Sequence, residues 1–208
     1  MRILIIGASR GTGLLAAKLA LEKGHQVTTL SRHPEQMQVE HPQLRKIKGD
    51  FHDQSAVFAT VPSHDAVIIT ASLSIAQLKQ QPDFYSRGTR LVIAAMQAAQ
   101  VPRIVVLSNL GAGDGHTLLN PLAKLFTYLL IREATADHTR QEQLARDSGL
   151  QWSVARPSRL TNGPARGNYQ KAVGRQVPGS ISRADVADFL LEAATTELWI
   201  GKTVNLGR

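Results

Sequence analysis

The sequence predicts an α/β fold: a single doubly wound parallel sheet with helices on both faces. Short, unbroken apolar runs typical of strands buried on both faces alternate with segments of helical apolar period. This alternation indicates parallel strands joined by helical crossovers. The expected strands are residues 3–6, 26–30, 44–48, 65–70, 103–107, 152–155 and 203–206. The expected helices are residues 14–21, 54–60, 84–100, 134–148 and a last helix that follows the capping sequence at 182–185.

We expect residues 1–208 to form one domain, because this length suits a single core. Two segments depart from the regular alternation, at about 109–131 and at about 158–180, and both are expected on the substrate side. The second, which we call the C-terminal excursion, is rich in Gly, Pro, Asn and Lys/Arg. Residues 74–82 are expected to form a polar loop. The apolar segment 118–131 suits a pocket wall, a dimer surface or a buried helix, and we expect a monomer or a homodimer.

Composition excludes several classes of site. There is no cysteine, which removes disulfides, thiolate zinc sites and cysteine nucleophiles, and we expect no metal site. Neither a signal peptide nor an apolar run long enough for a membrane span is visible, so we expect a cytoplasmic protein with no membrane partner. The net charge of +8 comes from dispersed basic residues and aromatics make up only 5%. This pattern favours an anionic small ligand over a nucleic acid.

The strongest functional pattern lies at the start of the chain. A buried strand at residues 3–6 leads into Gly-Ala-Ser-Arg-Gly-Thr-Gly at 7–13, and an apolar helix follows as far as Gly24. Strand, glycine turn and helix in this order are typical of a dinucleotide site, because the helix N-terminus offers N–H groups and a positive dipole end to phosphates.

Each glycine of this turn has an expected role. Gly7 allows the tight turn, Gly11 lets the backbone approach a pyrophosphate, and Gly13 permits close packing of helix on strand. Ser9 and Thr12 lie between them and are expected to contact the same ligand.

The end of the second strand indicates which dinucleotide binds. Sites that prefer NAD place an acidic residue here, which binds the ribose 2′-hydroxyl. This chain has Ser31 and Arg32 instead, and Arg10 in the glycine turn adds a second cation. Because guanidinium groups hold phosphates through charge-assisted bonds, the pattern favours NADP(H) over NAD(H).

Other strand ends supply further candidates. Asp50, after the third strand, either accepts from the adenine amino group or caps the helix that begins near Asp53. Thr70, the last residue of the fourth strand, and Ala71 and Ser72 after it suit a dinucleotide that lies across the edge of the sheet.

Candidates for the reaction itself follow the fifth strand. Ser108 and Asn109 lie where α/β sheets place their chemistry, and the glycine-rich residues 111–115 after them form either a lid or a turn. His138 is either a proton donor or a structural histidine.

Several motifs together resemble those of short-chain dehydrogenase/reductases. They are the glycine turn at 7–13, Gly49-Asp50, the strand 103–107 followed by Ser108, Arg156-Pro157, and Ser182-Arg183-Ala184-Asp185-Val186-Ala187. More narrowly, the chain resembles the atypical NAD(P)H-binding branch that contains flavin/biliverdin-IXβ reductases and NmrA-like proteins. The resemblance implies a Rossmann fold, a nicotinamide beside Ser108, and cofactor-binding roles for Arg156 and Pro157.

The chain departs from this group at two places. The usual Tyr-x-x-x-Lys pair is absent, and Tyr128 with Arg132 is the nearest substitute. Arginine stays protonated, so it cannot exchange protons as a lysine can. Flavin/biliverdin-IXβ reductases resemble this chain at Asp137-His138-x-Arg140 but carry a histidine where Arg159 stands here. Arg159 and Tyr169 are therefore candidates for a substrate pocket that suits an anion.

The sequence thus predicts an NADPH-dependent oxidoreductase that transfers hydride to a small planar acceptor, flavin- or quinone-like. The chief alternative is a non-catalytic NADP(H)-binding redox sensor of NmrA-like type. A sugar-nucleotide epimerase fits less well, because the chain is short for a separate sugar domain.

Overall fold

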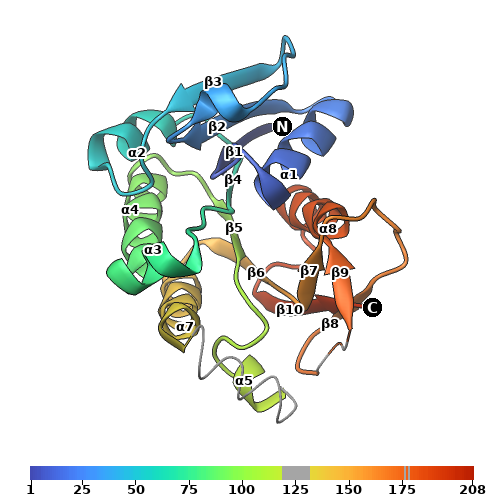
Figure 1. Ribbon diagram of the computed structural model, residues 1–208. Helices are drawn as coiled ribbons and strands as arrows, with labels where there is room; N and C mark the ends of the chain where they lie inside the picture. Colours follow the sequence, from blue (N-terminus) through green and yellow to red (C-terminus); the bar gives the residue numbers. More distant parts are fainter. Residues whose placement is uncertain (119–131, 176, 178) are drawn as a thin grey trace.

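The computed structural model describes residues 1–118, 132–175, 177 and 179–208 (Figure 1). Its main sheet has the strand order β3-β2-β1-β4-β5-β6-β10-β8, and all neighbours are parallel except β10 and β8. The fold is therefore the expected doubly wound, mostly parallel α/β sheet. The strands are β1 (Arg2–Ile6), β2 (Gln26–Ser31), β3 (Leu44–Lys48), β4 (Ala66–Ile69), β5 (Arg103–Leu107), β6 (Gln151–Pro157), β8 (Gln170–Ala172) and β10 (Lys202–Gly207).

Helices cover both faces of this sheet (Figure 1). One face packs against α1 and α8 in a single hydrophobic cluster, and the other packs against α2, α4 and α7. Because both faces are covered, β4 is buried along its whole length, and β1 is buried from Ile3 to Ile6. The helices are α1 (Gly11–Glu22), α2 (Gln54–Thr60), α3 (Ile75–Gln80), α4 (Phe84–Ala98), α5 (Gly115–Leu118), α7 (Arg132–Asp147) and α8 (Arg183–Thr195), with a 3₁₀ turn at Pro34–Gln36. No helix among these is long and apolar enough to cross a membrane.

The structure corrects two expectations about local structure. The segment 74–82 contains the helix α3 rather than only a loop, because Ser74 and Gln77 cap its start reciprocally. The set of expected strands is also incomplete, since β8 from the C-terminal excursion pairs with the far edge of β10. The excursion also forms a second small sheet, in which β7 (Arg159–Thr161) runs parallel to β9 (Ser180–Ser182).

Strand register brings the sequence-predicted residues to one edge of the sheet. Ile6 of β1 lies opposite Leu30 of β2 and opposite Ile69 of β4, so these strands end together. The next residues of these three strands, Gly7, Ser31 and Thr70, are therefore level with one another. Ser108 follows β5 at the same edge, one residue further on, because Val106 lies opposite Ile69. The carboxyl ends of parallel strands are where open α/β sheets bind ligands.

Candidate functional site

A cavity of about 1000 Å³ runs along this edge of the sheet. It reaches from the end of β2 to the end of β5, and α7 and the C-terminal excursion supply its farther walls. The cavity lining includes fourteen of the sequence-predicted residues: Gly7, Ser9, Arg10, Gly11, Thr12, Ser31, Arg32, Asp50, Thr70, Ala71, Ser72, Ser108, Asn109 and His138.

The glycine turn has the geometry that its sequence predicts. Gly7 has a positive φ of 91°, and a Cβ at this position would lie 2.5 Å from the backbone of Ala71. Gly13 does not line the cavity: a Cβ there would lie 2.4 Å from Thr70 Oγ1 and 2.5 Å from the carbonyl oxygen of Gly7. Gly7 and Gly13 therefore let β1, β4 and α1 approach closely, and this close approach leaves the α1 N-terminus at the cavity.

Two cationic side chains line the cavity, Arg32 after β2 and Arg10 in the glycine turn. Both arginines are exposed, whereas Ser31 is buried. Neither arginine lies within ion-pair distance of a carboxylate in the described part of the chain. Asp53, not Asp50, caps α2, by accepting from the amides of residues 55 and 56. Asp50 accepts from the backbone N–H of the residue 52 histidine at 2.8 Å and still lines the cavity.

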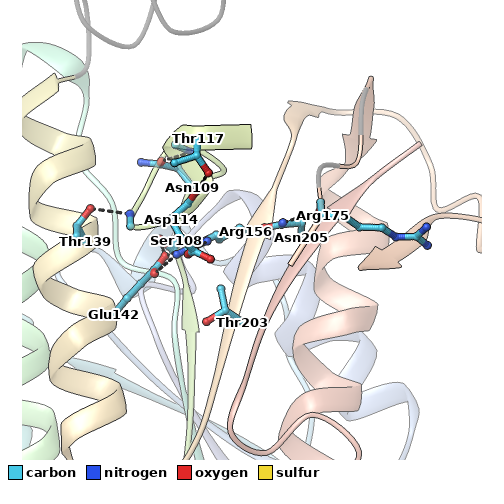
Figure 2. A network of polar contacts seen from close by, with 12 residues as sticks. Ser108, Asn109, Asp114, Thr117, Thr139, Glu142, Arg156, Arg175, Thr203 and Asn205 are labelled. Atoms are coloured by element: carbon cyan, nitrogen blue, oxygen red, sulfur yellow. Dashed lines mark hydrogen bonds and ion pairs between the residues drawn. The ribbon is translucent and has the colours of Figure 1, made fainter. Parts of the chain in front are cut away.

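At the β5 end of the cavity, the Ser108 hydroxyl donates to Glu142 Oε1 at 2.6 Å (Figure 2). Glu142 comes from α7, is fully buried, and also accepts from Arg156 and Arg146. A carboxylate between two guanidinium groups is an acceptor only, so the Ser108 proton is committed to it. What Ser108 can offer a ligand in the cavity is therefore an oxygen lone pair rather than a proton.

Arg156 is not at the cavity, which corrects the cofactor-binding role expected for it. Its guanidinium is 1% exposed, donates to Glu142 at 2.8 and 2.5 Å, and donates to Asp114 at 2.7 Å (Figure 2). Burial opposes its charge, but the bonds to Glu142 and Asp114 raise the pKa of Arg156 overall. A Cβ at Gly113 would lie 2.6 Å from Arg156 Nη2, so a residue without a side chain is needed there. Arg156 thus holds the glycine-rich loop after β5 in place.

His138 lines the cavity one helical turn before Glu142 and stacks on Tyr85, with ring centroids 3.7 Å apart. Its Nδ1 lies 2.9 Å from Gln141 Oε1, and Gln141 Nε2 donates to Thr89. This chain of bonds makes Nδ1 the protonated nitrogen and Nε2 the acceptor nitrogen of neutral His138. Burial lowers the pKa of His138, despite opposing effects from Gln141 and nearby carboxylates, so the neutral form is favoured.

The neighbours of His138 in the Asp-His-x-Arg motif have structural roles. Asp137 is buried and accepts from the backbone N–H groups of Tyr85 and Ser86 at the start of α4. Arg140 donates to Asp137 and to the carbonyl oxygen of Pro82. The motif therefore ties α7 to the N-terminus of α4, and this places His138 against Tyr85.

Four further predicted residues have other placements. Pro157 is buried at the end of β6 opposite Leu206, and Arg159 is exposed at the start of β7. Tyr169 donates its hydroxyl to Asp188 on α8, so its polar group is already engaged. None of these three lines the cavity. Tyr128 and most of segment 118–131 lie outside the described residues.

Sequence reasoning missed several residues that the fold brings to the cavity. Tyr85, Phe84 and Phe51 form aromatic walls, and Asn162 and Arg183 reach it from the C-terminal excursion and α8. Ser182-Arg183 was visible as a motif, but only as a helix start. Nothing in the local sequence says that the arginine lies opposite the glycine turn.

With this geometry in view, comparison with known proteins gives the family. A model of the NAD(P)H-binding family matches residues 7–197. The chain belongs to the NAD(P)H-binding family. The match begins at the glycine turn and includes every described residue of the cavity wall except Ile6.

Several known proteins are similar to this NAD(P)H-binding protein. It is 26% identical to the anaerobillin reductase ChuY from Escherichia coli O157:H7, with a TM-score of 0.83 and coverage of 100% of this chain and 97% of that one. It is 19% identical to a Veillonella parvula short-chain dehydrogenase/reductase in complex with NADP, with a TM-score of 0.81 and coverage of 100% and 94%; this likeness shows the fold alone. Cinnamoyl-CoA reductase 1 from Arabidopsis thaliana is 28% identical over 120 residues, 53% of this chain but only 34% of that enzyme.

Proposed function

We propose that this protein is an NADPH-dependent oxidoreductase that reduces a small planar acceptor, flavin- or quinone-like, and that it prefers NADP(H) over NAD(H). The observation that carries the proposal is the extent of the cavity, which is lined by Arg32 after β2, by Arg10 in the glycine turn after β1, and by Ser108 and His138 beyond β5. A dinucleotide with its adenosine at the β2 end would have its nicotinamide at the β5 end.

The residues fit the cofactor on chemical grounds. Arg10 and Arg32 lack carboxylate partners among the described residues, line the same cavity as Ser31, and together suit a 2′-phosphate. When bound, NADPH would supply the hydride. The protein's contribution is to hold the ring and the acceptor together and to limit access of water.

Ser108 and His138 would then act as acceptors of hydrogen bonds at the reactive end. The Ser108 proton is held by Glu142, and the neutral form of His138 has its proton on Nδ1. Ser108 can orient the nicotinamide amide or an N–H or O–H group of the acceptor. Since neither residue has a proton ready to give, we propose that solvent protonates the reduced acceptor.

The first test is titration of the purified protein with NADPH and NADH. We expect tighter binding of NADPH, and Arg10→Ala and Arg32→Ala should each weaken it by about 10- to 100-fold while changing NADH affinity little. Unchanged NADPH affinity in both variants would refute the 2′-phosphate assignment.

The second test is an NADPH-oxidation screen with flavins, quinones and anaerobillin, the last because the structural relative ChuY is named for it. Ser108→Ala should lower turnover while NADPH affinity stays near that of the wild type; full turnover would remove Ser108 from the mechanism. Tight NADPH binding with no acceptor reduced would favour the sensor, for which the missing Tyr-x-x-x-Lys pair is the supporting observation.

A further inference from the structure

Arg183 lines the cavity from the side opposite the glycine turn. It is the first residue of α8, and its side chain crosses toward Gly11, the first residue of α1. A Cβ built on Gly11 would lie 3.8 Å from Arg183 Nε and 3.9 Å from Arg183 Cδ, which is ordinary contact distance. The guanidinium stem therefore packs against the face of Gly11 that a side chain would otherwise cover.

Asn162 and the local backbone hold Arg183 in this position. Arg183 Nη1 donates to Asn162 Oδ1 at 2.6 Å, and Asn162 also lines the cavity. The pairing of β7 with β9 sets Thr161 opposite Ser182, so Asn162 and Arg183 directly follow the two paired strands at the same end. Ser182 also caps α8 by accepting from the Asp185 amide at 3.0 Å. The arginine is thus presented by an ordered frame, and little side-chain entropy remains to be lost on binding.

The charge of Arg183 has no carboxylate within ion-pair distance in the described part of the chain. The nearest acidic residue in sequence, Asp185, is occupied elsewhere: its Oδ1 accepts from the amides of Arg166 and Gly167, and its Oδ2 accepts from Ser182. A guanidinium carries five N–H donors, and Asn162 takes one of them. A half-buried arginine with unused donors at the wall of a cavity is suited to an anionic ligand.

We propose that Arg183 binds the pyrophosphate of the dinucleotide, opposite the N-terminus of α1, with Asn162 as its positioning residue. This inference rests on the proposed binding of NADP(H). It assigns the phosphates to two sets of cations: Arg10 and Arg32 to the 2′-phosphate, and Arg183 to the pyrophosphate. The C-terminal excursion then contributes to cofactor binding through Asn162.

The test compares two ligands that differ in the pyrophosphate, by calorimetric titration. NADPH carries both the 2′-phosphate and the pyrophosphate, whereas adenosine 2′-monophosphate carries only the former. Arg183→Gln should weaken the binding of NADPH by about tenfold or more and leave the affinity for adenosine 2′-monophosphate unchanged. Arg32→Ala should weaken the binding of both ligands. Arg183→Lys should recover part of the loss, because lysine keeps the charge but not the planar fork.

Arg166→Gln is the matched control. Arg166 is an exposed arginine of the C-terminal excursion, and its replacement by glutamine changes the net charge by the same amount. Unlike Arg183, it does not line the cavity. We expect NADPH affinity in this variant to match the wild type. A loss equal to that of Arg183→Gln would mean that general charge attraction, not contact, explains the effect, and would overturn the proposal.

Two other results would also overturn it. If Arg183→Gln binds NADPH as tightly as the wild type but raises the KM of the acceptor, then Arg183 serves the acceptor instead. If Arg183→Gln weakens the binding of both ligands equally, with an unchanged melting temperature, then Arg183 acts at the adenosine end of the cofactor. A wild-type protein that binds adenosine 2′-monophosphate and NADPH equally weakly would refute the proposed cofactor itself, so the two failures are distinguishable.

Discussion

Replacement of Arg156 by methionine tests how much the buried charge network behind Ser108 contributes to stability. The change removes the guanidinium from two bonds to Glu142 and one to Asp114. Glu142 is fully buried and, among the described residues, keeps only Arg146 and the Ser108 hydroxyl as partners. Loss of one partner from a buried ion pair costs about 3–5 kcal/mol, and because Arg146 remains we expect the lower end, about 3 kcal/mol.

Urea unfolding and a thermal melt measure this cost. For a chain of this size about 3 kcal/mol corresponds to a fall of about 10 °C in Tm. Asp114→Asn is the matched control, because Asp114 is 72% exposed and its pair with Arg156 should contribute less than about 1 kcal/mol. Adding Glu142→Gln to Arg156→Met should restore much of the stability, since it removes a buried charge that has lost one of its two guanidinium partners.

The reasoning fails if Arg156→Met costs less than about 1 kcal/mol, or if the second change brings no recovery. Either result would mean that Glu142 is paired well enough by Arg146 alone, or that water reaches it. The same variants also test the site, because Glu142 orients Ser108. If Arg156 and Glu142 have only a structural role, the variants should change stability and leave the pH profile of turnover unchanged.

Three further predictions follow from single contacts. Gly13→Ala should destabilise the fold by about 1–3 kcal/mol, since its Cβ would meet Thr70 and Gly7, whereas Gly163→Ala, with no atom within 4 Å, should stay within about 0.5 kcal/mol in urea unfolding. Burial lowers the pKa of His138 from 6.5, so the unfolded chain binds more protons than the folded chain just below that pH, and stability falls as the solution is acidified. In thermal melts from about pH 7.5 to about pH 5.5, His138→Gln should therefore lose less stability than the wild type. Burial and, to a lesser extent, the charge of Asp137 raise the pKa of Tyr85 to about 12, so the phenol stays protonated and Tyr85→Phe should leave the pH–rate profile below about pH 10 unchanged. If the wild type shows an alkaline limb below that pH and Tyr85→Phe lacks it, the phenol ionises there and the prediction is wrong.

Much of the candidate site was predictable because it lies at strand ends. Ser31, Thr70 and Ser108 each follow a strand that an apolar run reveals, and parallel strands bring their carboxyl ends together. The glycines were predictable for a similar reason: a backbone that must turn tightly or pass close to another strand excludes a Cβ, and that requirement is written in a short local pattern.

Side chains of helices and excursions were less predictable. Arg156 looked like a cofactor ligand, but the side chain points to Glu142, a residue on a helix 14 positions earlier in the chain. Tyr169 looked like a pocket residue, but Asp188 on α8 takes its hydroxyl. In both cases the sequence shows a polar group of the right type and says nothing about which distant partner satisfies it.

The sequence by itself therefore determined most of the alternation of strands and helices, the family, and the dinucleotide turn, because each depends on local backbone geometry and on periodic burial. Only the tertiary structure decided that the Ser108 hydroxyl donates a hydrogen bond to Glu142 and that Arg183 packs against Gly11. Hydrogen bonds and ion pairs act over a few ångströms between residues that are far apart in the chain. Their partners are set by how the helices and the excursion pack on the sheet, and no short-range pattern records that packing.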